Sequence, residues 1–529
     1  MNRPDLPAIG ELDRIDQVLS WHAGRTPDAR CLSFEGAHST YRQVDALVDR
    51  VARGLARRGL QPGDRVAVLS PPRPEYLILM MGISRAGGIY VGLNPRCTPA
   101  EVAQVLTRVE PRLVASIGQF DGRASATLFS QAGELVRLPE LLYFSSAAQC
   151  ADAFDSPAGP QLAPACPAPD DRTAAALDRT ASIVFTSGTT GQPKAAMLTH
   201  RGLLRAAWVQ HERLNPPNPR YLSNLPINHV GEVMNLTLSC LIGAGSLVFQ
   251  PRFSAAQALE LLRDEQVTCW VQVPAMFHDC VNHPDYAPAS LSHLRSVCAG
   301  GGALSARTLA RLRETGARLF VEYGQTETSS SATYSDEGAD DSVLLESIGR
   351  FDERFEFRIA DDRLQACETG SVGEIQGRGE LLFAGYFGDP QATAEAFTAD
   401  GWLKTGDLAL RRADGNIVLM GRSKEMIKSG GYNVYPRELE IILESHPAVS
   451  QVVVVGLPDE RLGESVHAVI VLREAACRAE SLALHCRQTL AGYKLPKSYR
   501  CIDAFPLLPN GKLDRVRTRQ LAGELAPLG

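Results

Sequence analysis

The apolar and polar positions of the first hundred residues alternate between a helical and a strand-like pattern. Apolar side chains recur at helical spacing between 42 and 60, and this pattern ends at Gly59. An uninterrupted apolar run at 65–69 predicts a buried strand, a second helix is expected over 74–86, and a second strand over 88–95. Strands that alternate with helices of this length predict a doubly wound parallel sheet.

The sequence after these elements predicts a connecting loop, a further strand and a smaller C-terminal domain. Residues 145–180 are crowded with Ala, Pro, Asp and Ser, which predicts a surface loop, and the apolar run 181–185 predicts the strand that follows it. A chain of 529 residues is too long for one compact core. We place a boundary after the polar Gly421-Arg-Ser, so that residues 1–423 form a large α/β domain and residues 424–529 a small α+β domain.

Composition and charge narrow the class of protein. Hydrophobic residues make up 44% and charged residues 22% of the chain, as in ordinary globular proteins, and a formal net charge of −6 gives no broad attraction to nucleic acid. Residues 1–16 are acidic without the apolar core of a secretory signal, and no apolar run is long enough to span a membrane. Twelve cysteines without a Cys-x-x-Cys pair fit a reducing compartment, so we expect a cytoplasmic protein.

The stretch Thr186-Ser-Gly-Thr-Thr-Gly-Gln-Pro-Lys194 follows the apolar run and has the features of an anion-binding loop. Gly188 and Gly191 let successive N–H groups point into one concavity, and Lys194 adds a positive charge. The hydroxyl donors are Thr186, Ser187, Thr189 and Thr190. No Gly-Lys-Ser/Thr triplet closes the loop, so it differs from the loop of nucleoside triphosphatases. On composition alone, a surface turn remains an alternative.

Further motifs follow in a fixed order and identify a family. They are Tyr323-Gly-Gln-Thr-Glu327, Lys404-Thr-Gly-Asp407, Gly421-Arg422 with Lys428-Ser-Gly-Gly431, and Pro509-Asn-Gly-Lys512. Together with the loop at 186–194 they resemble the signature of the adenylate-forming superfamily, which contains acyl-CoA synthetases, adenylation domains of peptide synthetases and luciferases. The motifs span more than three hundred residues, which excludes coincidence.

The resemblance implies a nucleotide site built from separate loops. Its expected ATP- or AMP-binding residues are Thr186, Ser187, Gly188, Thr189, Thr190, Lys194, Gly301, Gly302, Ala303, Glu322, Tyr323, Gly324, Gln325, Thr326, Asp407, Arg422 and Lys512. Tyr323 would stack on adenine, Thr326 would donate to the α-phosphate, and Glu327 would offer oxygen to Mg²⁺. Asp407 would accept hydrogen bonds from the ribose hydroxyls, and Arg422 would reach the same sugar. Without the resemblance, an isolated glutamate near a strand end is most often a solvated charge.

The resemblance also implies an acid pocket and a moving C-terminal domain. His229, Val230, Gly231, Cys298 and Gly300 are the expected pocket residues, within walls at 229–235, 298–302, 210–214 and 273–277. Lys424 is the expected hinge, and Lys428, Ser429, Gly430 and Gly431 are the expected CoA-binding residues. Lys512 would bridge the carboxylate and the α-phosphate, and Thr326 and His229 are the other expected catalytic residues. A lone His beside apolar residues is often structural, and Glu232 is expected to be paired or exposed.

These residues predict an AMP-forming ligase that joins a hydrophobic carboxylic acid, fatty or aromatic, to coenzyme A with ATP and Mg²⁺. An enzyme that loads a separate carrier protein is one alternative, although only seventeen residues follow Lys512 in this chain. A non-catalytic nucleotide-binding protein is another, and Lys194, Glu327, Asp407 and Lys512 argue against it. No nucleic-acid partner and no membrane span are expected, and a homodimer is left open.

Overall fold

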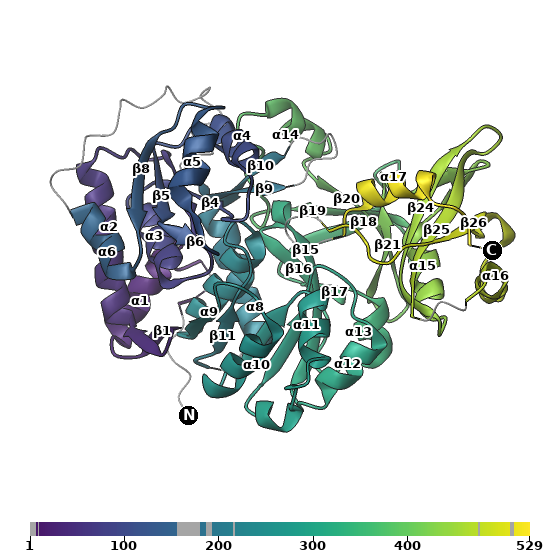
Figure 1. Ribbon diagram of the computed structural model, residues 1–529, viewed down its shortest axis with the longest axis horizontal. Coiled ribbons are helices and arrows are strands. Elements are labelled where there is room, and N and C mark those ends of the chain that lie inside the picture. The colour runs from purple at the N-terminus through teal and green to yellow at the C-terminus, as the bar shows by residue number, and fades with distance from the viewer. Residues whose placement is uncertain are drawn as a thin grey trace. The chain divides into compact units, whose positions relative to one another are not determined.

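The computed structural model describes residues 7–8, 10–155, 180–186, 193–214, 217–473, 477–507 and 513–528, and its contacts divide the chain into two compact units. The large unit comprises Met1–Glu356 and Gly377–Leu403, and the small unit comprises Phe357–Gln376 and Lys404–Gly529. Both units mix helices and strands (Figure 1). The predicted α/β fold class, with a large and a small part, is confirmed. The predicted functional boundary between residues 423 and 424 stays a prediction.

A six-stranded sheet of the large unit has the order β10-β9-β4-β3-β5-β8. Its strands are β3 (Arg65–Leu69), β4 (Ile89–Leu93), β5 (Leu113–Ile117), β8 (Glu140–Phe144), β9 (Thr180–Thr186) and β10 (Lys194–Thr199). All of them run parallel except β10, which pairs antiparallel with β9. Every residue of β3, β4 and β5 is buried, as expected for parallel strands covered on both faces.

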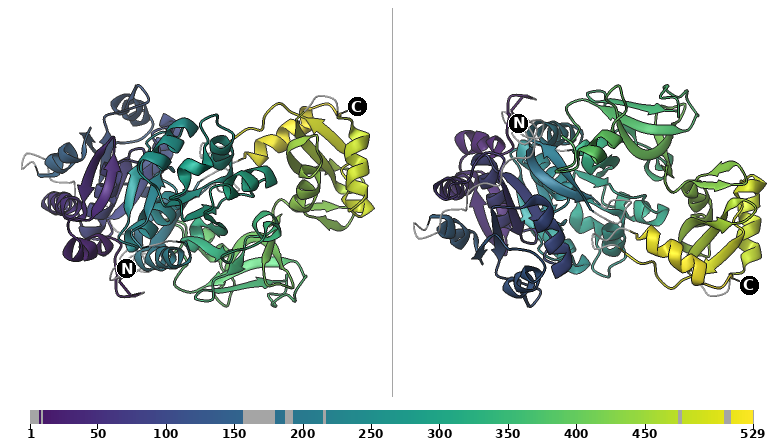
Figure 2. Two further views of the ribbon diagram at one scale, coloured as in Figure 1. Left: turned by 90° about the horizontal axis from the view of Figure 1, so that it is seen from below. Right: turned by 90° about the horizontal axis from the view of Figure 1, so that it is seen from above.

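Helices cover this sheet on both faces (Figure 2). The helices of residues 1–155 are α1 (Gln17–Arg25), α2 (Tyr41–Arg57), α3 (Pro74–Arg85), α4 (Pro99–Val109), α5 (Ser125–Gly133) and α6 (Ala147–Asp155), and a small hairpin, β6 (Gln119–Phe120) and β7 (Arg123–Ala124), precedes α5. Apolar side chains of α4 and α5 pack on alternate residues of β3 and β4, such as Ala67 and Val91. Thr40 caps α2 and Thr98 caps α4, each with a reciprocal bond from the third residue of its helix.

The prediction of a loop over the whole of 145–180 was wrong at its start, because Ala147–Asp155 forms α6. Four of its nine residues are alanine, which favours helix more than any other residue. Cys150, Ala151 and Phe154 lie buried on one side of α6, and a Cβ on Gly54 of α2 would overlap the Phe154 backbone. Close packing of α2 and α6 therefore stabilises this helix. Residues 156–179 lie outside the described part of the chain.

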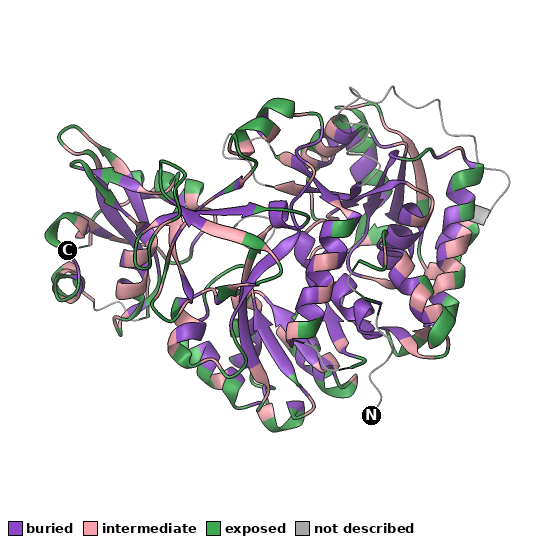
Figure 3. Cartoon of the chain, turned by 180° about the vertical axis from the view of Figure 1, so that it is seen from behind, coloured by how far each residue is buried: buried purple, intermediate pink, exposed green. Residues whose placement is uncertain are grey.

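A nine-stranded sheet of the large unit has the order β17-β16-β15-β14-β13-β11-β12-β1-β2. Its strands are β1 (Arg30–Phe34), β2 (Ala37–Thr40), β11 (Arg220–Ser223), β12 (Ser246–Phe249), β13 (Cys269–Gln272), β14 (Ser296–Ala299), β15 (Arg318–Gln325), β16 (Ser330–Tyr334) and β17 (Arg350–Phe351). The central strands from β1 to β15 run parallel. In Figure 3 these strands are mostly buried, whereas exposed residues gather on the outward sides of the helices.

The two faces of the nine-stranded sheet differ in their cover. Trp270, Val297 and Val321 face an apolar cluster that includes α10, α11 and α12. The opposite face meets α8 and a π-helix, η1, whose Asn235 contacts Glu322 of β15. The remaining helices of the large unit are α8 (His200–Leu214), η1 (Gly231–Leu238), α9 (Ser239–Ile242), α10 (Ala255–Asp264), α11 (Pro274–Val281), η2 (Pro288–Leu291), α12 (Ala306–Arg313), η3 (Thr326–Thr328), α13 (Asp341–Glu346) and α14 (Pro390–Ala396).

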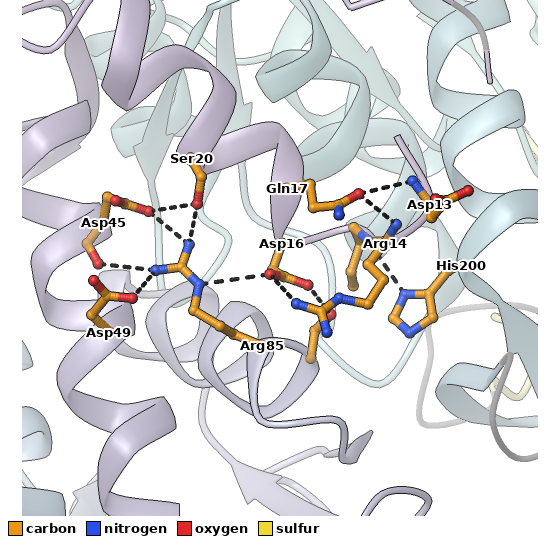
Figure 4. Close-up of polar contacts among 11 residues, drawn as sticks. Asp13, Arg14, Asp16, Gln17, Ser20, Asp45, Asp49, Arg85 and His200 are labelled. Atoms are coloured by element: carbon orange, nitrogen blue, oxygen red, sulfur yellow. Dashed lines mark hydrogen bonds and ion pairs between the residues drawn. The ribbon is translucent and has the colours of Figure 1, made fainter. Parts of the chain in front are cut away.

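A polar network joins the N-terminal segment to three helices (Figure 4). The Arg85 guanidinium lies 2.6 Å from Asp45 Oδ1, 2.5 Å from Asp49 Oδ1 and 3.6 Å from Asp16 Oδ2. The backbone N–H of Ile15 donates to His200 Nδ1 at 3.3 Å. Burial lowers the pKa of His200 to about 4, so its ring is neutral and Nδ1 remains an acceptor. The network therefore fixes the start of α1 against α2, α3 and α8.

The small unit contains most of two further sheets. A four-stranded sheet has the order β18 (Glu356–Ala360), β19 (Gly373–Arg378), β20 (Leu403–Arg411) and β21 (Ile417–Arg422). A five-stranded sheet contains β22 (Ile427–Ser429), β23 (Tyr432–Val434), β24 (Val449–Asp459), β25 (Gly463–Leu472) and β26 (Ser498–Cys501). The helices are α15 (Pro436–Glu444), α16 (Ala479–Arg487), η4 (Gly492–Lys494) and α17 (Arg515–Glu524). Among the described helices, none combines the length and the apolar character that crossing a membrane requires.

Candidate functional site

The β9–β10 hairpin positions the two ends of the predicted phosphate loop. Thr186 is the last residue of β9, Lys194 is the first of β10, and the two lie opposite each other in the antiparallel register. The hairpin therefore presents a hydroxyl and a cation at the same end of the sheet. The predicted residues Ser187, Gly188, Thr189 and Thr190 lie outside the described part of the chain.

A tyrosine that sequence reasoning missed joins Lys194 to Glu327. Lys194 Nζ lies 4.7 Å from the centroid of the Tyr386 ring, within the range of a cation–π interaction. The Tyr386 hydroxyl donates to Glu327 Oε1 at 2.8 Å. Burial and the nearby Glu327 carboxylate raise the pKa of Tyr386 above its usual value, so the hydroxyl keeps its proton. The structure thus brings together a predicted phosphate ligand and a predicted magnesium ligand.

Backbone hydrogen bonds fix Tyr386 in this place. The Met197 N–H donates to the Gly385 carbonyl at 2.9 Å, and the Phe387 N–H donates to the Ala195 carbonyl at 2.8 Å. The Phe383 N–H donates to the Glu327 carbonyl at 2.9 Å. The segment 383–387 therefore runs beside β10 and carries Tyr386 between the hairpin and η3. In the sequence, the role of Tyr386 was indicated only by its position between Gly385 and Gly388, and this is a weak signal.

The motif Tyr323–Glu327 passes from β15 into the short helix η3. Gly324 must be glycine, because a Cβ there would overlap the carbonyl group of Ser330 on the adjacent strand. Thr326 and Glu327 are buried, whereas Tyr323 is partly exposed and Gly324 is exposed. The Gln325 N–H donates to the Thr328 hydroxyl at 3.0 Å, which holds the turn. The motif therefore runs from an exposed edge into the interior.

The three glycines after β14 also run from the interior to the surface. Cys298 is buried, Gly300 is partly buried, and Gly301, Gly302 and Ala303 are exposed. Gly301 has φ +76, a conformation that a residue with a side chain rarely adopts. The exposed end suits the predicted approach of adenine to the backbone, and the buried end lies among the predicted acid-pocket residues. Cys298 is inert as a nucleophile, because burial raises the pKa of its thiol.

Gly231 begins the π-helix η1, a rare conformation that often occurs at functional sites, and His229 lies two residues before it. The Gly231 N–H donates to His229 Nδ1 at 3.0 Å. Because Nδ1 accepts this bond, the neutral ring carries its proton on Nε2. Val230, Gly231 and the rest of η1 are buried, and His229 is half-buried. His229 lies just before η1, and its Nδ1 is occupied by the Gly231 N–H.

Two buried carboxyl groups lie beside η1. Burial raises the pKa of Glu232 to about 7, although the Ser223 hydroxyl and the Leu225 N–H, at 3.0 Å, both donate to it. The expectation that Glu232 is paired or exposed was wrong, because the side chain is fully buried and its described partners are neutral hydrogen-bond donors. Burial also raises the pKa of Glu322 to about 7, and Asn235 Nδ2 donates to its Oε1 at 2.7 Å.

The small unit pairs Asp407 with Arg422. Asp407 and Arg422 face each other in the β20–β21 register, and Arg422 Nε lies 3.0 Å from Asp407 Oδ1. Thr405 and Gly406 anchor the turn before Asp407, since the Thr405 hydroxyl donates to the Ile375 carbonyl at 2.6 Å and the Gly406 N–H donates to Glu374 Oε1 at 2.8 Å. The two residues predicted to bind the ribose are thus adjacent.

The predicted CoA-binding residues form a tight β-hairpin in the small unit. Ser429 pairs with Tyr432 across a two-residue turn, in which Gly430 and Gly431 both have positive φ, +60 and +83. The predicted hinge residue Lys424 lies exposed in the turn between β21 and β22. Lys512 lies outside the described residues, and the flanking Leu507 and Leu513 form a β-bridge.

Family models match both parts of the chain. The model of the AMP-binding enzyme matches residues 19–387, which is more than half of the chain. The chain belongs to this family. The model of the AMP-binding enzyme C-terminal domain matches residues 438–512. The predicted membership in the adenylate-forming superfamily is confirmed.

Relatives of this AMP-binding enzyme match it over nearly the whole length. Indoleacetate–CoA ligase from Aromatoleum aromaticum is 33% identical over 96% of this chain and 98% of its own. Feruloyl-CoA synthase from an Amycolatopsis species is 32% identical over 95% and 99%. The crystal structure of ATP-bound MatB from Rhodopseudomonas palustris is 28% identical and superposes with a TM-score of 0.82 over 96% and 99%.

The residues of this AMP-binding enzyme suit one Mg²⁺ held mainly by a nucleotide. In the described part of the chain, no group of three His, Cys, Asp or Glu side chains is placed to hold a metal ion. Glu327 offers a single buried carboxylate beside Lys194 and Tyr386. Mg²⁺ commonly binds through one or two carboxylates together with substrate phosphates. Glu327 therefore fits a magnesium ion that arrives with ATP.

Proposed function

We propose that this AMP-binding enzyme converts a hydrophobic carboxylic acid to its CoA thioester through an acyl-adenylate. It is an acid–thiol ligase, as its relatives that span the same length are. In the first step a carboxylate oxygen attacks the α-phosphorus of ATP, and pyrophosphate leaves. In the second step the CoA thiol attacks the acyl carbon, and AMP leaves. The group formed by Lys194, Tyr386 and Glu327 supports the first step most directly.

Lys194 and Thr186 are proposed to bind the ATP phosphates with the loop between them. An ATP molecule carries several negative charges, and Lys194 balances part of that charge while Glu327 holds the accompanying Mg²⁺. Tyr386 orients both residues, because its ring lies under the ammonium group and its hydroxyl binds the carboxylate. Tyr323, the residues 301–303 and the pair Asp407–Arg422 are proposed to bind adenine and ribose.

Positive charge and N–H donors are proposed to lower the barrier to adenylation. Two anionic groups must approach each other when the carboxylate meets the α-phosphate, so a cation that bridges them stabilises the transition state. Lys512 is proposed for this role, and Thr326 is proposed to donate to the α-phosphate. His229, which lies just before η1, is proposed to orient the carboxylate. Lys424 is proposed as the hinge and residues 428–431 as the CoA-binding segment.

The acid is proposed to be hydrophobic and larger than acetate. Val230, Gly231 and Cys298 are buried and small or apolar, and Gly300 lacks a side chain. Two relatives are named for aromatic acids, indoleacetate and ferulate. We also propose a cytoplasmic location, which is supported by the free thiols of all eleven cysteines in the described residues.

A coupled assay tests this function. Purified protein is incubated with ATP, Mg²⁺, CoA and a panel of fatty and aromatic acids, and pyrophosphate, AMP and thioester are measured. We expect the three products in equal amounts when acid and CoA are both present, and without CoA we expect pyrophosphate only up to about the amount of enzyme. Thioester formed on a phosphopantetheinylated carrier protein but not on CoA would instead identify a carrier-loading enzyme. Nucleotide binding without pyrophosphate release from any acid would contradict a catalytic function.

A further inference from the structure

Glu322 is a buried carboxyl group with one oxygen left without a partner. Its side chain is nine-tenths buried, and Oε1 accepts the 2.7 Å bond from Asn235 Nδ2. Oε2 is buried as well and has no hydrogen-bond partner of normal geometry among the residues that the structure describes, although the Ser331 hydroxyl and the Cys298 thiol lie close enough to lower the pKa of the carboxyl group. A buried polar atom without a partner costs about 1–3 kcal/mol. Such an oxygen can accept a hydrogen bond from a ligand, and this bond would offset the cost.

The Glu322 carboxyl group lies at the inner end of the predicted acid pocket. Cys298 and Gly300 alternate along the chain, so both face the same side of the sheet. A Cβ on Gly300 would lie 2.8 Å from Glu322 Oε1, which places the carboxyl group on that side too. Asn235 reaches it from η1, the helix that begins at Gly231, two residues after His229. The carboxyl group is therefore next to residues from both predicted walls.

The change from exposed to buried residues along two segments indicates in which direction the predicted acid pocket enters the protein. Gly301 to Ala303 are exposed, Gly300 is partly buried and Cys298 is buried. On β15, Gly324 is exposed, Tyr323 is partly exposed and Glu322 is buried. Both segments thus run inward toward the same place. An acid whose carboxylate stays near His229 at the outer end of η1 would point its far end toward Glu322.

Asn235 holds Glu322 in a defined orientation. Its Nδ2 also lies 2.7 Å from Gln210 Oε1 and 2.9 Å from Ser331 Oγ, and Gln210 Nε2 donates to the Asn235 carbonyl at 2.7 Å. These contacts come from the helices α8 and η1 and from strand β16 of the sheet, and the three elements contact one another. The acceptor is therefore preorganised, which reduces the entropy lost when a ligand binds.

We propose that Glu322 selects hydrophobic carboxylic acids that carry a neutral hydrogen-bond donor, a hydroxyl or ring N–H group, at the end remote from the carboxylate. This inference rests on the proposed function. The donor would bind Oε2 and satisfy it. A neutral donor suits the site better than an ammonium group, because burial of a second charge adds a desolvation cost to that of the carboxylate. A site built to bind a hydroxyl group strongly rejects an analogue that lacks it.

Matched acids that exchange a hydroxyl for a methyl group test the inference. The pairs are para-hydroxyphenylacetate with para-tolylacetate, and omega-hydroxyhexanoate with heptanoate; para-(aminomethyl)phenylacetate supplies an ammonium group. We expect kcat/KM for pyrophosphate release to be at least about tenfold higher for the hydroxyl member of one pair. In Glu322→Leu this ratio should fall to about one, because the acceptor is lost. Gly300→Ala should also lower the hydroxyl-to-methyl ratio, because its Cβ would displace the Glu322 carboxyl group.

A matched control and a stability measurement separate recognition from folding. Glu75 is another buried carboxyl group of the large unit, but both of its oxygens bind Arg73, at 3.2 and 3.3 Å. Glu75→Gln should leave the hydroxyl-to-methyl ratio unchanged. Glu322→Leu should raise the Tm, because it removes a buried acceptor without a partner while Asn235 keeps Gln210 and Ser331.

Each contrary result has a distinct meaning. Equal use of both members of every pair would overturn the selection by Glu322 and leave the ligase function intact. A preference for the acid with the ammonium group would overturn the proposal that the site binds a neutral donor. An unchanged ratio in Glu322→Leu with a higher KM for ATP would assign the side chain to the nucleotide. If no acid released pyrophosphate, the proposed function itself would fail, and this inference with it.

Discussion

Tyr386 donates its hydroxyl hydrogen to Glu327 over 2.8 Å while its ring lies 4.7 Å below the ammonium group of Lys194. The three residues come from three separated segments, namely β10, η3 and the chain at 383–387. Their contact couples the proposed phosphate and magnesium ligands. A change at Tyr386 should therefore alter the use of MgATP before it alters the use of the acid.

Tyr386→Phe should weaken the use of MgATP by about tenfold. The substitution removes the hydrogen bond to Glu327, which is worth about 1.5–3 kcal/mol when the acceptor is charged, and keeps the ring under Lys194. The KM for ATP is measured over a range of Mg²⁺ concentrations with one fixed acid. We expect a higher Mg²⁺ requirement and a KM for the acid that changes little.

Tyr286→Phe is the matched control, because the Tyr286 hydroxyl donates to the Arg311 carbonyl at 2.8 Å, outside the candidate site. This variant should retain the parent's KM for ATP. Tyr386→Leu should be worse than Tyr386→Phe, since it also removes the ring below Lys194. Equal KM values for ATP in parent and Tyr386→Phe would show that Tyr386 does not support nucleotide binding.

Lys512→Ala should separate the two half-reactions. Loss of a bridging cation should raise the adenylation barrier by roughly 3–4 kcal/mol, as for removal of one preorganised donor. Thioester formation from supplied acyl-adenylate should survive. Lys497, an exposed lysine of the small unit, provides the control variant Lys497→Ala, with both rates unchanged. An equal loss in both half-reactions would show that Lys512 is shared between them or structural.

Glu232→Gln should change how stability depends on pH. Burial raises the pKa of Glu232 from its ordinary 4.5 to about 7 in the folded state. Between these values the folded state holds a proton that the unfolded state has lost, so the free energy of unfolding falls as pH rises through this window. The shift is worth on the order of 3 kcal/mol in full.

The neutral amide of Glu232→Gln has no such dependence. The variant should match the parent near pH 4.5, gain relative stability as pH rises, and reach its largest advantage above pH 7. Chemical denaturation of both proteins from pH 4.5 to 8.5 measures the difference, in which the other titrating groups cancel. A difference that stays flat with pH would mean that Glu232 ionises in the folded state as it does in the unfolded chain.

Arg85→Met should destabilise the large unit by about 2–4 kcal/mol. Arg85 binds Asp45 and Asp49 and approaches Asp16, whose side chain is only 3% exposed (Figure 4). Removing Arg85 takes this cation from the partly buried Asp45 and Asp49, whereas Asp16 keeps Arg14 at 3.0 Å. Arg42→Met is the control, because Arg42 pairs with Asp28 where both side chains are more than half exposed. That variant should lose less than about 1 kcal/mol. Similar losses in both variants would show that the Arg85 network adds no more than a surface pair.

Local sequence patterns predicted the elements that are formed by local apolar runs. The strand predicted at 65–69 is β3, and the helix predicted at 74–86 is α3, one residue shorter. The helix α6 was missed because its alanine-rich sequence lies next to a Pro-rich stretch and it is stabilised by packing on α2. Its buried face depends on contacts with residues about one hundred positions away.

The candidate site could be predicted only where a motif carried it. The motifs named Lys194 and Glu327, but Tyr386, which joins them, lies almost two hundred positions after Lys194 and depends on the pairing of β10 with the segment at 383–387. Likewise, the sequence placed Glu322 beside Tyr323 without showing that its side chain meets Asn235 and Gly300. Such contacts follow from long-range strand order, which spacing along one chain does not reveal.

Gly231→Ala should discriminate between acids by size. A Cβ on Gly231 would lie 3.0 Å from His229 Nδ1 and 3.3 Å from Leu225 Cδ1, so the histidine ring must shift by a few tenths of an ångström. Overpacking of a defined pocket costs about 1–3 kcal/mol, and this cost should fall on the acids that fill it. We expect kcat/KM to fall about tenfold or more for aromatic and medium-chain acids and to change little for acetate and propanoate.

Gly24→Ala is the matched control for Gly231→Ala. Gly24 lies in α1, and a Cβ there meets no atom within 4 Å. It should leave kcat/KM unchanged across the acid series. The decisive measurement is kcat/KM over a series of chain lengths and ring sizes, together with the KM for ATP, for parent and both variants. A uniform loss for every acid would assign Gly231 to the placement of His229 alone, whereas a loss that grows with acid size places Gly231 in the wall of the acid pocket.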